Sequence, residues 1–168
     1  LDDLSRYLLS LHAHRRITGE IVIDTFSQNT EDYGPPASTL TDNGSVYTSR
    51  FTGGRNGFEY LLAALGVRQK NGSPGHPQTQ GKIERFHQTQ KRWLAAKPPA
   101  QTLQHLQQQL LEFQHAYNTK RPHRSLEGHT PEHAYHATIK ATPQTLADTT
   151  HYRIRIDRLD PRGKACLR

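Results

Sequence analysis

The stretch that decides the fold is His76–Lys91, HPQTQGKIERFHQTQK. It opens on a proline and a Gln-Thr-Gln-Gly turn and then continues without a helix breaker, which predicts the start of a helix. Glu84 falls in the first turns of that helix. A donor and a cation follow on the same face, at His87, Gln88 and Lys91. A carboxylate backed in this way is suited to hold a metal ion beside a phosphate.

A second acidic signal lies upstream, where the apolar run Ala37–Leu40 leads to Asp42, Asn43 and Gly44. The run predicts a short buried strand, and Asn-Gly predicts a turn after it. A carboxylate at the carboxyl end of a buried strand is where α/β folds place their chemistry. Taken singly, each acid has an ordinary alternative: Asp42 suits an Asx-turn, and Glu84 suits the dipole at a helix N-terminus.

The composition narrows the class of protein. The chain has 168 residues, which favours one domain with a tail, and a formal net charge of +7 with a pI near 9.8. Such a charge suggests a nucleic-acid partner, with a basic protein that binds none as the alternative. Cys166 is the single cysteine, which excludes a disulfide framework and a four-cysteine zinc site. The sequence contains no apolar run near 18 residues, so we expect a cytoplasmic, nucleoid-associated protein without a membrane span.

Four motifs in this order resemble one known family. They are TDNG at Thr41–Gly44, GHPQTQGKIERFHQT at Gly75–Thr89, YNTKRPHRSL at Tyr117–Leu126 and TPEHAY at Thr130–Tyr135. Together they resemble the catalytic core of DDE integrases and insertion-sequence transposases, over about residues 1–137, which is most of the chain. The resemblance implies a ribonuclease-H-like α/β fold, with a mixed sheet flanked by helices. It also implies metal-dependent cutting and joining of DNA.

The resemblance gives the two acids a shared role. By it, Asp42 is the second acidic ligand of the family's metal site and Glu84 is the third. Enzymes of this kind place two divalent ions about 4 Å apart, to activate the attacking oxygen and steady the leaving one. Mg²⁺ prefers carboxylate oxygens, and Mn²⁺ is the alternative ion. With the order and flanks of both motifs considered together, the metal site is favoured over the two ordinary alternatives.

The resemblance also places the first acidic ligand on a strand that we expect to be missing from this chain. Asp2 and Asp3 then belong to a turn over Leu1–Arg6, between two strands of a hairpin. The missing strand would lie between the predicted strands Tyr7–His14 and Ala37–Leu40. Its loss would leave backbone groups unsatisfied, so we expect the chain to be poorly stable and inactive in strand transfer.

Two functional hypotheses therefore stay open. In the first, the chain is a transposase core that performs DNA integration or transposition by cleavage and strand transfer. In the second, it is an inactive transposase remnant that only binds DNA non-specifically. A plain nucleic-acid-binding regulator would need a helix-turn-helix or zinc motif, and the sequence contains neither.

Basic side chains near the two acids are candidates for DNA contacts. Those in the loop of the YNTKRPHRSL motif are the better candidates, because those on the Glu84 helix equally suit a solvated face. The expected partners are the element ends and target DNA, bound by a homo-oligomer, as the resemblance implies. The candidate DNA-binding residues are His87, Lys91, Arg92, Lys120, Arg121, His123 and Arg124.

The hydrophobic pattern in the rest of the chain predicts further helices and strands. Gly19–Tyr33 suits both a strand and a helix, and the resemblance favours the helix. In Thr102–Tyr117, apolar residues spaced by three and four predict an amphipathic helix with Gln104–Gln109 on its solvated face. We further predict a helix at Phe58–Leu65 ended by Gly66, a strand at Val67–Lys70, and a short helix capped by Thr130.

The domain prediction follows from these elements. The integrase core spans residues 1–137, a linker spans 138–150, and residues 151–168 begin a C-terminal all-β module. The strict alternation of Tyr152–Ile156 predicts the first strand of that module.

Overall fold

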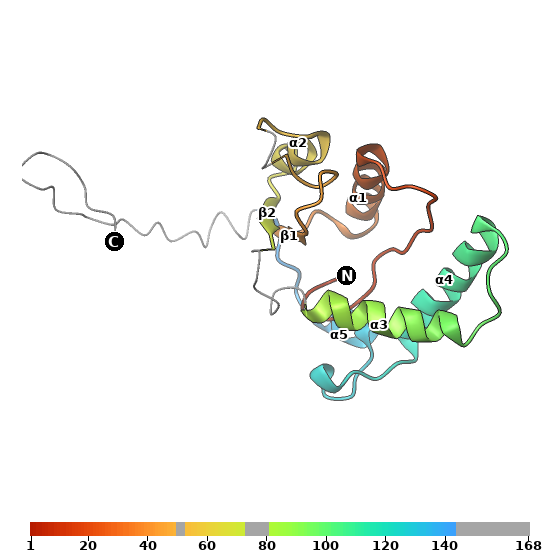
Figure 1. Cartoon of the computed structure of the whole chain (residues 1–168). Coiled ribbons are helices and arrows are strands. Elements are labelled where there is room, and N and C mark those ends of the chain that lie inside the picture. Colours follow the sequence, from red (N-terminus) through yellow and green to blue (C-terminus); the bar gives the residue numbers. More distant parts are fainter. Residues whose placement is uncertain (50–52, 73–80, 144–168) are drawn as a thin grey trace, which may run out of the picture.

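The computed structural model describes residues 1–49, 53–72 and 81–143. In Figure 1 a small sheet lies between α1 and α2 on one side and α3, α4 and α5 on the other. This arrangement confirms the predicted α/β class, while the predicted strand Tyr152–Ile156 lies outside the described residues. In chain order the elements are α1 (Gly19–Tyr33), β1 (Ser38–Thr41), α2 (Gly57–Ala64), β2 (Arg68–Asn71), α3 (Gly81–Ala95), α4 (Leu103–Thr119), the 3₁₀ turn η2 (Arg124–Leu126) and α5 (Pro131–Ala137).

The sheet consists, within the described ranges, of β1 and β2 in parallel. Their register runs from Ser38 opposite Arg68 to Thr41 opposite Asn71, so both strands end at the same edge. The prediction of a buried strand before Asp42 was wrong in one respect. No residue of β1 is buried, and Leu40 is 45% exposed, because a sheet with two described strands leaves β1 with a single paired edge.

Capping residues set the helix boundaries largely as predicted. The Thr18 side chain accepts a hydrogen bond from the first turn of α1, and Gly34 ends this helix at a φ of 80°. The helix alternative for this segment is therefore confirmed. Thr102 and Thr130 cap α4 and α5 in the same way, and Pro131 occupies the start of α5, where its missing N–H costs nothing.

Two separate hydrophobic cores hold these elements. The sheet core consists of Val22, Phe58, Leu62 and Val67, contributed by α1, α2 and the residue before β2. The aromatic core consists of Phe86 from α3, Phe113 and Tyr117 from α4, and Leu8 from the segment before α1. Among the helices of the described part, none is long and apolar enough to cross a membrane.

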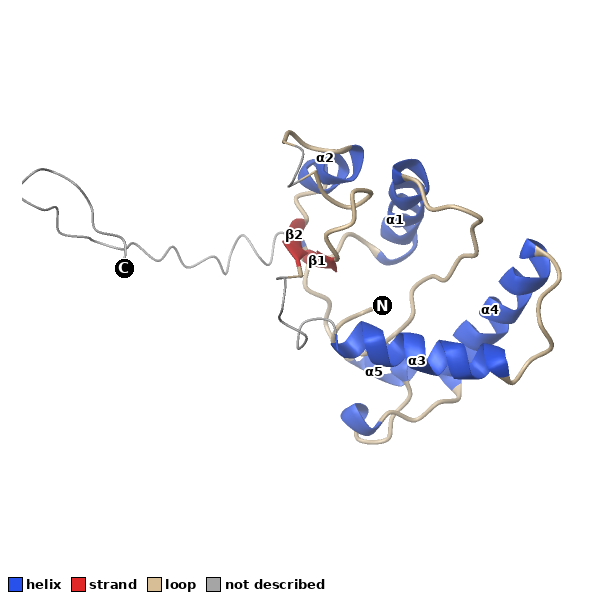
Figure 2. Cartoon of the chain, in the orientation of Figure 1, coloured by secondary structure: helices blue, strands red, loops and turns tan. Residues whose placement is uncertain are grey.

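The segment Tyr7–His14 is extended but is not a strand, so this prediction was wrong (Figure 2). Its backbone is bonded by side-chain amides of α4 instead of by a neighbouring strand. Asn118 accepts from Leu8 N at 2.9 Å and donates to Leu8 O at 3.0 Å, and Gln114 donates to the same oxygen at 3.0 Å. Gln107 accepts from the N–H of Ala13 at 2.8 Å and donates to Leu11 O at 3.0 Å. We call these three side chains, Gln107, Gln114 and Asn118, the amide ladder.

The prediction that Gln104–Gln109 form a solvated face was right for Gln104 and Gln108, which are exposed, and wrong for Gln107 and Gln109. Gln107 is half-buried against the extended segment. Gln109 is buried and donates to Pro98 O at 2.8 Å. Glutamine satisfies backbone groups as well as it faces water, so its polarity alone does not reveal which side of a helix is exposed.

Candidate active site

Asp42 follows β1 directly, as predicted, and its side chain is exposed. Its Oδ1 accepts a hydrogen bond from Gly44 N at 2.7 Å, so the Asx-turn alternative is realised. The turn fixes the carboxylate without burying it, so the side chain stays available to a ligand. A Cβ on Gly44 would lie 2.9 Å from Asp42 Oδ1, so a larger residue at this position would displace the carboxylate.

Asn43 ties this turn to the end of the second strand. Its Nδ2 donates to Gly72 O at 3.0 Å, and Gly72 N donates to Thr41 O at 3.0 Å. The Oδ1 atom of Asn43 is buried and has no hydrogen-bond partner in the part of the chain that the structure describes. An orphaned oxygen beside a carboxylate suits a site that receives a donor from outside. The sequence predicted only a turn at Asn43, and the TDNG motif was the signal for a role beyond that turn.

Glu59 fixes the loop that follows Asp42. Its carboxylate accepts from Thr48 Oγ1 at 2.8 Å, Ser49 Oγ at 2.7 Å and Asn56 N at 2.9 Å. These hydrogen bonds, that from Ser49 first, lower the pKa of Glu59 from 4.5 to about 2. Glu59 is thus ionised at neutral pH and joins the loop to α2.

Glu84 lies in the first turn of α3 and is exposed, as predicted. Two residues later, Phe86 is 3% exposed in the aromatic core and anchors this end of the helix. His87, Gln88 and Lys91 are exposed as well, which fits the predicted open face.

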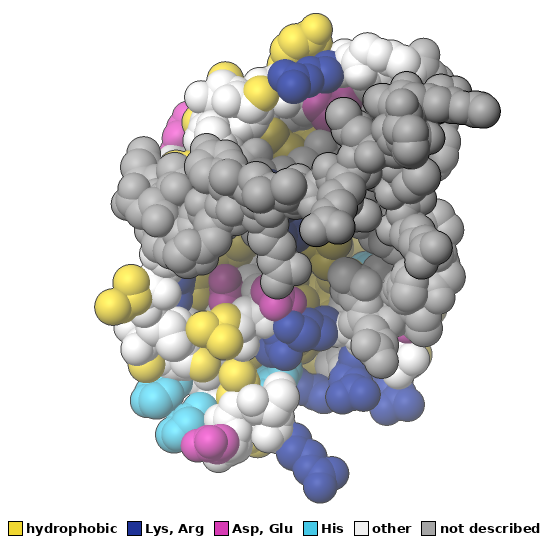
Figure 3. Space-filling view, turned by 90° about the vertical axis from the view of Figure 1, so that its left-hand side faces the viewer, with side chains coloured by type: hydrophobic (Ala, Val, Ile, Leu, Met, Phe, Trp, Pro, Cys, Tyr) yellow, Lys and Arg dark blue, Asp and Glu magenta, His cyan; other side chains and the backbone are white. Residues whose placement is uncertain are grey.

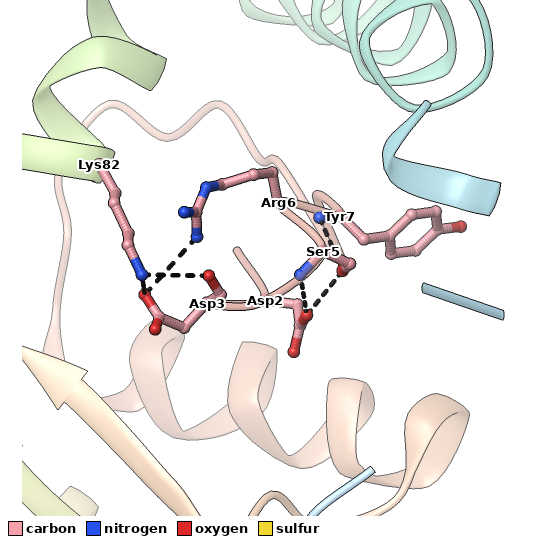
Figure 4. A network of polar contacts seen from close by, with 6 residues as sticks. All are labelled: Asp2, Asp3, Ser5, Arg6, Tyr7 and Lys82. Atoms are coloured by element: carbon pink, nitrogen blue, oxygen red, sulfur yellow. Dashed lines mark hydrogen bonds and ion pairs between the residues drawn. The ribbon is translucent and has the colours of Figure 1, made fainter. Parts of the chain in front are cut away.

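The N-terminal turn packs against the start of α3 (Figure 4). Asp2 Oδ2 accepts from Ser5 N at 2.8 Å and Ser5 Oγ at 2.6 Å, which confirms the predicted turn. Asp3 pairs with Lys82, with 2.6 Å between Oδ1 and Nζ. The first turn of α3 is therefore attached to the N-terminal turn two residues before Glu84.

The candidate DNA-binding residues lie on α3 and around the end of α4. Figure 3 shows Lys and Arg side chains gathered over the lower part of one face, where these helices lie. His123 differs from the others, since it is half-buried against the Tyr117 ring at a centroid distance of 4.9 Å. Burial first, and then the charges of Arg121 and Arg6, lower the pKa of His123. It is therefore neutral at pH 7. The exposed ones are His87, Lys91, Arg92, Lys120, Arg121 and Arg124.

Comparison with known proteins identifies the family. Residues 1–77 match a family model described as an integrase core domain, and residues 65–131 match a second model of the same description. The two matches together span residues 1–131 and support an integrase core in this chain.

Similar proteins agree with this assignment. The catalytic core domain of BIV integrase is 29% identical, with a TM-score of 0.54, and the match covers 71% of this integrase core and 72% of that chain. A putative integrase, ORF3 of Spiroplasma virus SpV1-C74, is 29% identical over 97 residues. The uncharacterized protein K02A2.6 of Caenorhabditis elegans is 26% identical over 145 residues. This chain spans 27% of the length of the viral protein and 11% of the nematode protein.

The side chains of this integrase core fit a hard divalent cation in part. Asp42 and Glu84 offer exposed carboxylates, the ligands that Mg²⁺ prefers, and Asn43 adds an unpaired oxygen beside Asp42. Within residues 1–49, 53–72 and 81–143, no three His, Cys, Asp or Glu side chains form a group that could hold a metal ion. Mg²⁺ commonly binds through one or two carboxylates with water and substrate phosphate, so two acids are a sufficient protein contribution to one ion.

Proposed function

We propose that this chain is the catalytic core of a DNA integrase or transposase that cleaves and joins DNA with the help of a divalent metal ion. The observation that carries the proposal is the placement of the two acids in an integrase core. Asp42 stands at the carboxyl end of β1 and Glu84 in the first turn of α3, and both side chains are exposed.

In this proposal Asp42 and Glu84 hold Mg²⁺ or Mn²⁺. The bound ion would neutralise charge on the phosphate and activate the attacking oxygen. Gly44 and Asn43 keep the Asp42 carboxylate in place through the turn and its bond to Gly72. Phe86 holds Glu84 in place, because its burial fixes the first turn of α3.

Charge supports DNA as the partner. The chain carries a net charge of +7, and the cations on α3 and after α4 are exposed to a polyanion. His123, being neutral at pH 7, would contact a phosphate as a hydrogen-bond donor rather than as a cation. Element ends and target DNA are the proposed substrates, and a homo-oligomer is the proposed assembly.

The second candidate function is DNA binding without catalysis. This candidate is favoured by the finding that the described residues form no group of three metal ligands. Under this alternative the exposed cations on α3 and after α4 still bind DNA. Asp42 and Glu84 then have no chemical role.

Metal-induced stabilisation and DNA nicking separate the two functions. We expect Mn²⁺ to raise the thermal unfolding midpoint of the chain, since a ligand that binds only the folded state stabilises it. Asp42→Asn and Glu84→Gln should each abolish this shift and any metal-dependent nicking of a DNA duplex. Asp24→Asn is the matched control, because Asp24 is an exposed acid on α1. A metal response that survives both site variants would contradict the catalytic proposal and leave DNA binding alone.

A further inference from the structure

A second charged network lies beside Glu84 and has no part in the proposed metal site. The Asp3 side chain is 81% exposed, and two cations converge on it (Figure 4). Lys82 Nζ lies 2.6 Å from Asp3 Oδ1, and Arg6 Nη1 lies 3.8 Å from the same oxygen. Lys82 and Arg6 therefore form a positively charged position that suits an anion, and the Asp3 carboxylate occupies it.

Arg6 is held at this position by a strained turn. Its φ of 64° is left-handed, a conformation that residues other than glycine seldom adopt. The carbonyl of Asp2 accepts the Arg6 N–H at 3.0 Å and helps to impose it. Backbone strain of this kind is found at ligand-binding positions, where the surrounding structure sustains it.

The guanidinium of Arg6 is not fully used within the protein. Its side chain is 18% exposed, and the buried Nη1 has no hydrogen-bond partner, because 3.8 Å to Asp3 exceeds hydrogen-bonding distance. Lys82 is half-exposed and likewise faces Asp3. An exposed ion pair contributes at most about 1 kcal/mol, so a stronger anion can displace the Asp3 carboxylate at little cost.

We propose that Lys82 and Arg6 form a binding site for one backbone phosphate of DNA, and that Asp3 occupies this site as an internal competitor in the free protein. A phosphodiester offers two charged oxygens, which suit an ammonium and a guanidinium together. The inference rests on the proposed function, since DNA is the partner. Beyond that function, the inference names the position of one DNA phosphate, bound by Lys82 two residues before Glu84. It also names Asp3 as a carboxylate that weakens DNA binding until the phosphate displaces it.

Removal of the Asp3 charge tests the inference. Binding of a short fluorescein-labelled DNA duplex is followed by fluorescence anisotropy over a range of salt concentrations. Asp3→Asn should tighten binding roughly 3- to 10-fold more than Asp24→Asn, which removes the same charge from the exposed face of α1. The slope of log affinity against log salt should steepen by about 0.9, the contribution of one phosphate.

A second variant tests whether the gain in DNA affinity depends on the cations that Asp3 occupies. In the Asp3→Asn background, Lys82→Gln should remove most of the gain in affinity, and thermal unfolding confirms that each variant is folded. Equal binding by Asp3→Asn and Asp24→Asn, or a gain that survives Lys82→Gln, would overturn the inference while wild-type DNA binding stands. Absence of DNA binding by every variant would instead refute the proposed function as well.

Discussion

The half of the molecule that carries Asp42 and the half that carries Glu84 are built differently. The sheet half, α1, β1, α2 and β2, packs around the mostly aliphatic sheet core. The helical half, α3, α4 and α5, packs around the aromatic core, where the rings of Phe86, Phe113 and Tyr117 lie 5.5 to 5.9 Å apart. The element pairs with the most extensive contacts all lie within one half. The two acids are thus held by separate cores.

Among the described residues, two segments between helices contribute contacts that join the halves. Leu8 packs into the aromatic core, while Ser10 Oγ, two residues on, accepts from Asn29 of α1 at 2.7 Å. After α5, Ala141 O accepts from Ala37 N at 2.9 Å, directly before β1. Tyr33 of α1 also meets Tyr135 of α5 edge to face, at a centroid distance of 6.1 Å. These contacts lie outside the two hydrophobic cores.

The largest expected effect comes from the centre of the aromatic core. Phe113→Ala should lower the free energy of unfolding by roughly 3–5 kcal/mol, because Phe113 is 2% exposed and its truncation leaves a cavity. Hydrogen exchange should then accelerate in α3 and α4 more than in α1 and α2. Leu62→Ala in the sheet core is the mirror experiment and should give the reverse pattern. Equal acceleration in all four helices would mean that the halves unfold as one unit.

The amide ladder is the next target, since it attaches the connecting segment to α4. Asn118→Ala should cost roughly 1–3 kcal/mol, because the buried Leu8 N–H loses its acceptor. Denaturant unfolding measures this loss. Gln108→Ala, at an exposed position of the same helix, should change stability by no more than about 0.5 kcal/mol. Similar losses in the two variants would show that the amide ladder contributes nothing specific.

Glu59 should make the sheet half sensitive to acid. Its pKa in the folded state, about 2, lies below the ordinary 4.5, so its contribution to stability is present above pH 4.5 and is lost as the pH falls towards 2. Glu59→Gln should cost roughly 1–2 kcal/mol at neutral pH and flatten the loss of stability in that range. Unfolding midpoints of wild type and variant at several pH values test this. Parallel pH profiles for the two proteins would refute the assignment.

The smallest effect on stability is expected at Gly44, where substitution should instead displace the Asp42 carboxylate. Gly44→Ala should change the free energy of unfolding by about 0.5 kcal/mol or less, because the clash is with the end of an exposed side chain. The displaced Asp42 carboxylate should nevertheless weaken metal-induced stabilisation. Gly19→Ala is the control, since a Cβ there meets open space. An undiminished metal response in Gly44→Ala would argue against Asp42 as a ligand.

Short sequence patterns predicted the features that depend on neighbouring residues, such as helix caps and turns. The position of Asp42 after a strand and the cap at Thr130 depend on neighbours within a few residues. The local pattern of Gly19–Tyr33 suited both a strand and a helix, and only the family resemblance favoured the helix that the structure contains. Tyr7–His14 was predicted as a strand because alternation is a local pattern, whereas its backbone bonds to the amide ladder join residues 94 to 110 positions apart in the chain. The same limit applies to Asn43, whose hydrogen bond to Gly72 O forms only where the ends of β1 and β2 meet.

The amide ladder also has a polarity. Asn118 and Gln107 each give and receive a hydrogen bond, whereas Gln114 only donates, to Leu8 O and Leu9 O. If the extended segment slipped by one residue along α4, the N–H and C=O of Leu8 would both leave the Asn118 amide that bonds them. A ladder of side chains on a helix therefore sets the alignment of the segment, as a paired strand would. This alignment keeps Leu8 in the aromatic core that supports Glu84.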